Sequence, residues 1–309
     1  MKQQLTLLDG GMGQELIRRS RAEKPHPLWS LQVMMDEPDL VSDVHRDFCR
    51  AGARVICLNT YSVTRHRLTM GNDLPNLPDL LALARRLAEA GVAASGCTGV
   101  DIVASLPPLT ASYLTQSPLS EQQMTDEYEE LIRLQMNHID GFIAETLPTI
   151  AEGRAALQGA ANAGTAIHLA LTVLDEDGTR LRSGERLADA IDTLLPMGPD
   201  SILINCSVPE AIDQALPIVA NKTDRFGAYA NGFHSITALK PGGTVDVLSA
   251  REDLTPVAYT DMAVKWLNLG ASILGGCCEV GPDHIEELAH RASGLGREIA
   301  GLPASVARG

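Results

Sequence analysis

The sequence predicts an α/β protein folded as a single (β/α)8 TIM barrel with its site at the carboxyl ends of the strands. Eight short apolar segments alternate with segments of helical character along 309 residues. Connections after several of these strands are long, whereas connections before them are short. We therefore expect residues 1–309 to form one barrel domain, and a doubly wound open sheet is the competing architecture.

The eight expected strands are mostly continuous apolar strings, which is typical of strands covered on both faces. Alternating apolar and polar residues would instead indicate a sheet with one face in water. In chain order the strands are expected at Leu5–Asp9, Arg54–Thr60, Val100–Leu106, Gly141–Thr146, Ala166–Val173, Ser201–Ser207, Phe226–Asn231 and Ala271–Cys278.

Helices are expected between these strands, and proline marks several helix starts because its missing N–H costs nothing in the first turn. The expected helices include Asp79–Ala94, Glu121–His138, Glu185–Leu195 and Asp283–Ile299. The prolines that mark a start are Pro148, Pro209, Pro256 and Pro282.

Loop lengths distinguish the two ends of the predicted barrel. Turns that lead into strands are brief, as at 51–53, 198–200 and 269–271, whereas the connection after the seventh strand runs from Gly232 to Leu254. Long loops on one side indicate that the carboxyl ends of the strands build the functional site, as barrels of this class do.

Composition excludes several classes of protein. Lys and Arg total 25 against 39 Asp and Glu, a net charge of −14, which argues against partners that are nucleic acids or anionic membranes. Apolar runs stay well below the roughly 20 residues of a membrane span, and glycines interrupt the first residues before any signal-peptide core. Six cysteines are too few for a disulfide framework, so we expect free thiols in the reducing cytoplasm.

Polar residues follow six of the expected strands at their carboxyl ends. A single polar strand end carries little information, because strand ends meet loops, but six together indicate a site. They are Asp9-Gly10-Gly11, Asn59-Thr60-Tyr61, Glu145-Thr146, Asn205-Cys206, Asn231-Gly232 and Gly275-Gly276-Cys277-Cys278.

Three cysteines stand at two of these ends. Strands six and eight flank strand seven, so Cys206 can meet Cys277 and Cys278 across the barrel mouth. Three thiolates with an open fourth position suit Zn²⁺, and Gly275 and Gly276 permit close backbone approach. The alternative is a set of buried free thiols, with a strained vicinal disulfide as a further variant.

The set DGGMG, NTY, ET, NC and GGCC, in this order over essentially the whole chain, resembles the homocysteine S-methyltransferase family. The resemblance implies a zinc-dependent barrel enzyme of the EC 2.1.1 class that transfers a methyl group to homocysteine and forms methionine. It assigns the zinc thiolates to Cys206, Cys277 and Cys278, and the carboxylates that hold the homocysteine ammonium to Asp9 and Glu145.

The remaining substrate contacts are expected from the same strand ends. Backbone N–H groups of Gly10 and Gly11 suit the substrate carboxylate, and Asn59 and Asn231 shape the site. No catalytic side chain is expected beyond the zinc-bound thiolate. Asp9 has an alternative role as a turn residue before glycine, and Glu145 as a cap for the helix near Pro148. Arg65 and His66 are candidates for the border of the methyl-donor pocket.

The sequence indicates the methyl donor less clearly than it indicates homocysteine, the methyl acceptor. Ala230 stands where many family members have proline, and Ser105–Leu109 replaces an expected glycine-proline pattern. From the resemblance and the length of 309 residues, we expect no cobalamin or folate modules and no C-terminal extension like that of betaine-using relatives. We expect a sulfonium donor, S-methylmethionine or S-adenosylmethionine, with betaine and dimethylsulfoniopropionate left open.

Two alternatives to this function also stay open. One is methyl transfer to selenohomocysteine or another small thiol, and the other is a non-catalytic zinc-binding barrel. In each case the expected partners are small molecules, with no nucleic acid and no membrane, and the expected assembly is a monomer or weak oligomer.

Overall fold

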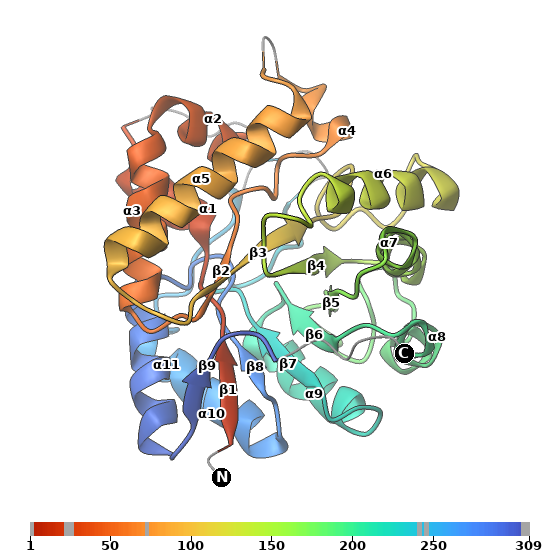
Figure 1. Ribbon diagram of the computed structural model, residues 1–309. Coiled ribbons are helices and arrows are strands. Elements are labelled where there is room, and N and C mark those ends of the chain that lie inside the picture. The colour runs from red at the N-terminus through yellow and green to blue at the C-terminus, as the bar shows by residue number, and fades with distance from the viewer. Residues whose placement is uncertain (1–2, 22–27, 72–73, 240–242, 244–246, 304–309) are drawn as a thin grey trace.

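A computed structural model describes residues 3–21, 28–71, 74–239, 243 and 247–303 (Figure 1). All strand pairs are parallel, in the order β2-β3-β4-β5-β6-β7-β8-β1-β9. The strands are β1 (Gln4–Leu7), β2 (Val55–Cys57), β3 (Asp101–Leu106), β4 (Gly141–Leu147), β5 (His168–Leu171), β6 (Ser201–Asn205), β7 (Phe226–Tyr229), β8 (Ile273–Leu274) and β9 (Glu298–Ala300).

The ends of this sheet meet, so the strands enclose a barrel. Leu8, just after β1, forms a parallel bridge with Val55 of β2. The amide of Asp9 donates to the Val55 carbonyl at 3.0 Å, and that of Arg54 to the Leu7 carbonyl at 2.8 Å. The predicted (β/α)8 barrel is confirmed, and the open sheet is excluded.

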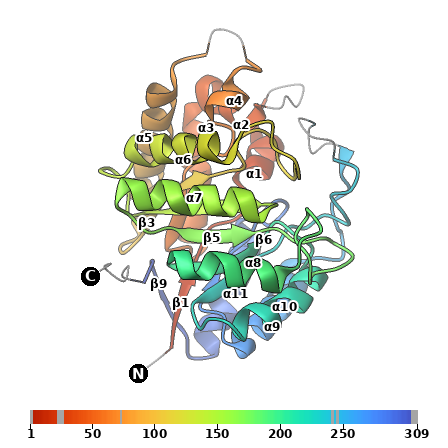
Figure 2. The ribbon, with the colours of Figure 1, turned by 90° about the vertical axis from the view of Figure 1, so that its right-hand side faces the viewer.

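Helices surround the strands, and α6, α7 and α8 lie side by side on the outside of the barrel (Figure 2). The helices of the described residues are α1 (Met12–Arg19), α2 (Trp29–Asp36), α3 (Pro38–Arg50), α4 (Arg65–Leu68), α5 (Leu77–Ser95), α6 (Glu121–Arg133), α7 (Ile150–Ala163), α8 (Leu187–Leu194), α9 (Pro209–Ala220), α10 (Pro256–Leu269) and α11 (Pro282–Gly294), with a 3₁₀ turn at Leu195–Met197. None of them is long and apolar enough to cross a membrane.

Three of the four prolines are the first residue of a helix, as predicted, at Pro209, Pro256 and Pro282. Pro148 is different, because α7 begins two residues later. Thr149 is the N-cap of α7, and its hydroxyl accepts a hydrogen bond from the Glu152 amide at 3.1 Å. The Thr149 hydroxyl satisfies one of the free N–H groups of the first helical turn, so α7 begins after Thr149.

Two expected helices end earlier than predicted. Helix α11 stops at Gly294, where Gly296 takes a left-handed φ of 76°, and residues 298–300 then form β9 against β1. The predicted helix to Ile299 is therefore wrong at its end, because pairing with an exposed strand edge competes with the last helical turn. Helix α6 stops at Arg133 instead of His138, and the chain turns there to enter β4.

The barrel interior contains one apolar side chain from each of the eight enclosing strands or its immediate end. The inner cluster comprises Leu8, Val55, Val103, Ile143, Ala170, Leu203, Tyr229 and Ile273. A second, larger cluster fills the space between the strands and the helices. Strands buried on both faces explain why the sequence shows continuous apolar strings.

His45 is a polar exception in the outer core. It lies fully buried on α3, in close contact with α5. A Cβ added to Gly91 of α5 would stand only 2.7 Å from the Cβ of His45. Neither ring nitrogen has a hydrogen-bond partner among the described residues, and burial lowers the pKa of His45 to about 3. The neutral ring is therefore held in the folded protein at a cost in desolvation.

Replacing His45 by leucine is expected to stabilise the fold by about 1–2 kcal/mol, because the unpaired polar ring is removed. The gain should grow as pH falls below about 6.5, since the unfolded histidine then takes up a proton that the folded one refuses. Urea unfolding of both proteins at pH 7 and pH 5 measures this. A variant that is less stable at both pH values would contradict the account.

Candidate functional site

Reciprocal packing of glycines joins the loop after β1 to the loop after β8. A Cβ at Gly10 would stand 2.1 Å from the Val280 carbonyl oxygen, and one at Gly11 would stand 2.5 Å from that of Cys277. A Cβ at Gly276 would in turn meet Val280. No side chain fits between these backbones, which explains the DGG and GGCC motifs in physical terms.

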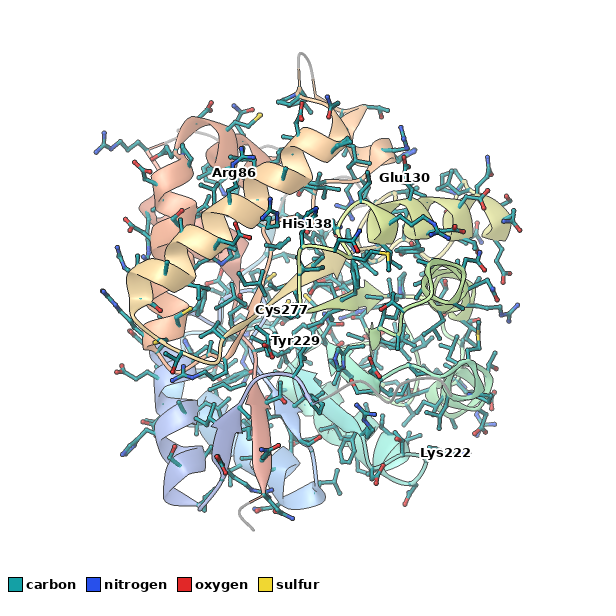
Figure 3. The ribbon with its side chains drawn as sticks, viewed as in Figure 1. Arg86, Glu130, His138, Lys222, Tyr229 and Cys277 are labelled. Carbon is teal, nitrogen blue, oxygen red and sulfur yellow. The ribbon has the colours of Figure 1, made fainter. Side chains whose placement is uncertain are left out.

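The thiols of three cysteines meet at this junction. Cys206 follows β6, and Cys277 and Cys278 follow β8; their sulfur atoms all lie within 4.8 Å of one another. The Sγ atoms of Cys206 and Cys277 are 2.9 Å apart. Cys277 and Tyr229 lie near the barrel axis, inside the ring of helices (Figure 3).

The charge state of this cluster favours a cation. Hydrogen bonds from Cys277 and Cys278 hold the pKa of the Cys206 thiol well below its usual value. The hydrogen bonds of Cys277 with Cys206 and Cys278 raise the pKa of the Cys277 thiol, and burial and the repulsion between neighbouring thiolates raise it further. A divalent metal removes this repulsion, so the three sulfurs fit a metal with S ligands.

A pocket of about 260 Å³ opens beside the thiols at the carboxyl ends of the strands. Asp9, Gly10, Asn59 and Glu145 line it together with the three cysteines. Its other walls are largely apolar and aromatic, with Met12, Trp29, Tyr61, Tyr113 and Tyr229 among the lining residues. The pocket therefore combines a metal-binding end, two carboxylates and an apolar wall.

Asp9 and Glu145 are both held by the strands around the pocket. The Asp9 Oδ2 accepts a hydrogen bond from the Cys57 amide at 2.9 Å, and burial raises its pKa well above the usual value. Glu145 accepts from the Ser105 hydroxyl and, at 3.5 Å, from Tyr229. Burial raises the pKa of Glu145 to about 7. A bound cation beside the two carboxylates would stabilise their ionised form, so the pocket favours a cationic group here.

Neither carboxylate caps a helix. Helix α1 begins after Gly11 with no side-chain cap, and the Asp9 side chain accepts from the Cys57 amide instead. Helix α7 is capped by Thr149, and the Ile150 amide donates to Glu185 at 3.0 Å. The Gly11 amide donates to the Val280 carbonyl at 2.9 Å. Gly11 is therefore not free to bind a substrate carboxylate, which corrects that expectation and leaves Gly10 as the candidate.

The two asparagines differ in their surroundings. Asn59 lines the pocket, and its Nδ2 donates to the Ser30 carbonyl at 2.9 Å. Asn231 is fully buried outside the pocket lining, its Oδ1 accepts from the Phe233 amide at 3.1 Å, and its Nδ2 has no partner among the described residues. Asn59 is thus a wall residue, whereas Asn231 organises the loop after β7.

Some pocket residues differ from those that the sequence suggested. Arg65 lies on the surface and pairs with Glu130, and neither Arg65 nor His66 lines the pocket; Arg67 does. Its guanidinium lies 5.1 Å from the centre of the Tyr61 ring. Helical spacing puts Arg65 and Arg67 on different sides of the short α4, a distinction that requires the helix start to be known. Part of the long loop after β7 (240–242 and 244–246) lies outside the described residues.

Comparison with known families decides which kind of barrel this is. The family model described as homocysteine S-methyltransferase matches residues 6–292. The chain belongs to the homocysteine S-methyltransferase family. This confirms the resemblance carried by the five motifs, and it makes the chain a methyltransferase of the EC 2.1.1 class.

Relatives in this family align over nearly their whole length. The chain is 24% identical to homocysteine S-methyltransferase 1 of Brassica oleracea var. italica, over 91% of each protein. It is 25% identical to homocysteine S-methyltransferase of Escherichia coli K12, over 94% of this chain and 96% of that protein. A selenocysteine Se-methyltransferase of B. oleracea var. italica is 24% identical, over 92% and 88%.

The solved structure of homocysteine methyltransferase MmuM from E. coli in its metallated form has the same fold. It superposes with a TM-score of 0.77 at 23% identity, over 94% of this chain and 97% of that one. At this identity the similarity supports the barrel fold alone. The roles of site residues in this chain are therefore inferred from its own side chains.

Ser105 is a residue that the motifs did not assign, and removing its hydroxyl gives a testable result. We expect Ser105→Ala to raise the KM for homocysteine about tenfold with little change in kcat, because a hydrogen bond to a charged carboxylate contributes about 1.5–3 kcal/mol. Steady-state kinetics measure KM and kcat separately. Ser201→Ala is the control, since that buried hydroxyl contacts His168 instead. An unchanged KM for Ser105→Ala would show that the Ser105 hydroxyl does not support Glu145 in substrate binding.

Proposed function

We propose that the chain transfers a methyl group from a sulfonium donor, S-methylmethionine first among the candidates, to the thiol of L-homocysteine on a zinc ion held by Cys206, Cys277 and Cys278. Methionine is the product. The observation that carries this proposal is the meeting of three thiols within 4.8 Å in the pocket that Asp9 and Glu145 also line.

The donor set supports zinc as the metal. A catalytic Zn²⁺ has three protein ligands and an open fourth position, and thiolates are among the ligands it prefers, whereas Mg²⁺ and Ca²⁺ prefer oxygen. When bound, zinc keeps the homocysteine sulfur deprotonated at neutral pH. The protein residues must then hold and orient the substrate.

Orientation has to supply most of the rate. A thiol of pKa about 8.5 is already a few per cent ionised at pH 7, so full ionisation gains about 30-fold at most, or roughly 2 kcal/mol. Holding sulfur and methyl carbon in line offers about 7–11 kcal/mol. We assign Asp9 and Glu145 to the homocysteine ammonium and the Gly10 amide to its carboxylate. Asn59 forms part of the pocket wall, and Asn231 supports the loop after β7.

The apolar side of the pocket supports a sulfonium donor. Trp29, Tyr61 and Tyr113 are among its lining residues, and aromatic faces attract desolvated cations. A sulfonium also leaves as a neutral thioether once its methyl group has moved, so no charge has to be stabilised on the leaving group. S-adenosylmethionine is the second candidate, with betaine and dimethylsulfoniopropionate behind it.

The remaining features of the proposal follow from the site. All the assigned residues come from one chain, so a monomer suffices. We treat residues 1–309 as one barrel domain, and the pairing of β1 with β9, which are the first and last strands of the described residues, supports this. Three thiols that must stay reduced suit the cytoplasm.

Methionine formation by reduced, zinc-loaded protein tests the proposal. Homocysteine is supplied with each of the four donors, and competition with selenohomocysteine and selenocysteine ranks the acceptors. Turnover with S-methylmethionine and homocysteine supports the proposal. No turnover with any donor, on protein that holds one zinc per chain, would favour a different thiol acceptor or a non-catalytic zinc site.

A further inference from the structure

The loop after β3 places the Tyr113 side chain directly on a metal-binding cysteine. The Tyr113 Oη lies 3.0 Å from the Sγ of Cys206. The Tyr113 backbone has φ 60°, the left-handed region that residues other than glycine rarely adopt. Such strain persists only where the surroundings enforce it, and it clusters at functional sites.

A buried ion pair fixes the Tyr113 ring from behind. The Arg182 guanidinium lies 5.3 Å from the ring centre and pairs with Asp175 at 2.7 Å, with side chains only 6% and 8% exposed. Asp175 also accepts hydrogen bonds from the Ser235 hydroxyl at 3.1 Å and the Ile236 amide at 3.0 Å. The loops after β3 and β7 thus both contact the Arg182–Asp175 pair of the loop after β5, through Tyr113 on one side and through Ser235 and Ile236 on the other.

This arrangement is costly and no step of methyl transfer uses it directly. Burying an ion pair costs several kcal/mol per ion before the pair repays it. The left-handed backbone of Tyr113 adds about 1–3 kcal/mol. A cation over the ring face also draws electron density from the phenol, which makes its O–H a better hydrogen-bond donor.

The direction of the hydrogen bond follows once a metal is bound. A metal-bound thiolate carries no proton, so the phenol O–H must donate and the sulfur must accept. We infer that Tyr113 is a positioning residue for the metal centre, which donates a hydrogen bond to the Cys206 thiolate and is held in place by Arg182 and Asp175. This inference rests on the proposed three-cysteine metal site.

The consequence is an unequal sharing of charge among the sulfurs. A hydrogen bond withdraws charge from Cys206 and fixes its orientation toward the metal. The substrate sulfur has no such bond from Tyr113 and stays the more electron-rich nucleophile. Groups that orient metal ligands in this way typically contribute 10–100-fold in metal affinity or activity.

Cobalt titration of two tyrosine variants tests the inference without turnover. Tyr113→Phe removes only the hydroxyl, and Tyr61→Phe is the matched control, because the Tyr61 hydroxyl lies in the same pocket but contacts Ser112 at 2.9 Å. We expect Tyr113→Phe to bind Co²⁺ about tenfold more weakly in competition with a chelator. Its sulfur-to-cobalt charge-transfer band should move to lower energy, while Tyr61→Phe matches the parent protein.

The other outcomes separate this inference from the proposed function. Parental affinity and an unmoved charge-transfer band in Tyr113→Phe would overturn the inference and leave the metal site intact. A change confined to the ligand-field bands would also overturn it, since the tyrosine oxygen would then be a direct ligand. A parent protein that shows no thiolate-cobalt band would remove the proposed metal site itself.

Discussion

Replacing Cys277 by serine is expected to abolish both metal binding and methionine formation while the barrel stays folded. Serine is nearly the same size, but its hydroxyl does not ionise as a thiol does, so one of the three sulfur ligands is lost. Loss of even an outer contact to a ligand costs 10–100-fold, so we expect metal affinity to fall by more than about a hundredfold. Metal analysis and methionine assays measure the two effects.

Cys97→Ser is the matched control for this experiment. Cys97 is a half-buried thiol whose Sγ contacts the Cys49 carbonyl at 3.5 Å, outside the pocket lining. The control variant should keep its metal and its turnover. Methionine formation by a zinc-free Cys277→Ser protein would falsify the role assigned to the cluster.

Replacing Glu145 by glutamine is expected to weaken homocysteine binding by about a hundredfold. The amide cannot pair with the substrate ammonium, and losing a hydrogen-bonded charge partner in a dry pocket costs about 2–5 kcal/mol. The three cysteines are untouched, so the metal content should not change. Homocysteine titration calorimetry and the KM at pH 8 measure the effect, and unchanged binding would exclude Glu145 as an ammonium partner.

Glu145 should also give the parent protein a pH dependence that the glutamine variant lacks. Burial raises its pKa to about 7 in the free protein, so the carboxylate becomes protonated and neutral as pH falls through 7. Homocysteine affinity should therefore decline up to about tenfold per pH unit below pH 7. Ionisation of the homocysteine thiol affects both proteins alike, so the difference between their profiles isolates Glu145. Parallel profiles would contradict this.

Sequence alone was sufficient for the barrel and its thiols because both depend on strand order. Apolar strings locate the strands, and parallel strands in a closed barrel bring their carboxyl ends to one rim, where Cys206 can meet Cys277 and Cys278. Strand β9 was not predictable in the same way. Its three residues carry little apolar pattern, and their pairing with β1 depends on an edge that exists only after the barrel closes.

The positions of side chains on the long loops could not be predicted from the sequence. Tyr113 stands between Ser112 and Leu114 in the loop after β3, outside every expected strand. Its contact with Cys206 depends on a left-handed backbone and on an ion pair from another loop. Arg65 and His66 were placed near the pocket because they follow β2, yet the orientation of α4 turns Arg65 to solvent and brings Arg67 inward. Loop direction is set by contacts distant in sequence, which periodicity does not encode.

X-ray absorption at the zinc edge, before and after homocysteine is added, tests the central claim most directly. The account predicts three sulfur neighbours at about 2.3 Å in the free protein and four once homocysteine binds. Glu145→Gln protein should need far more homocysteine to make the same change. A spectrum that homocysteine leaves unaltered at saturation, or one with fewer than three sulfurs in the free protein, would contradict a substrate-binding zinc held by Cys206, Cys277 and Cys278.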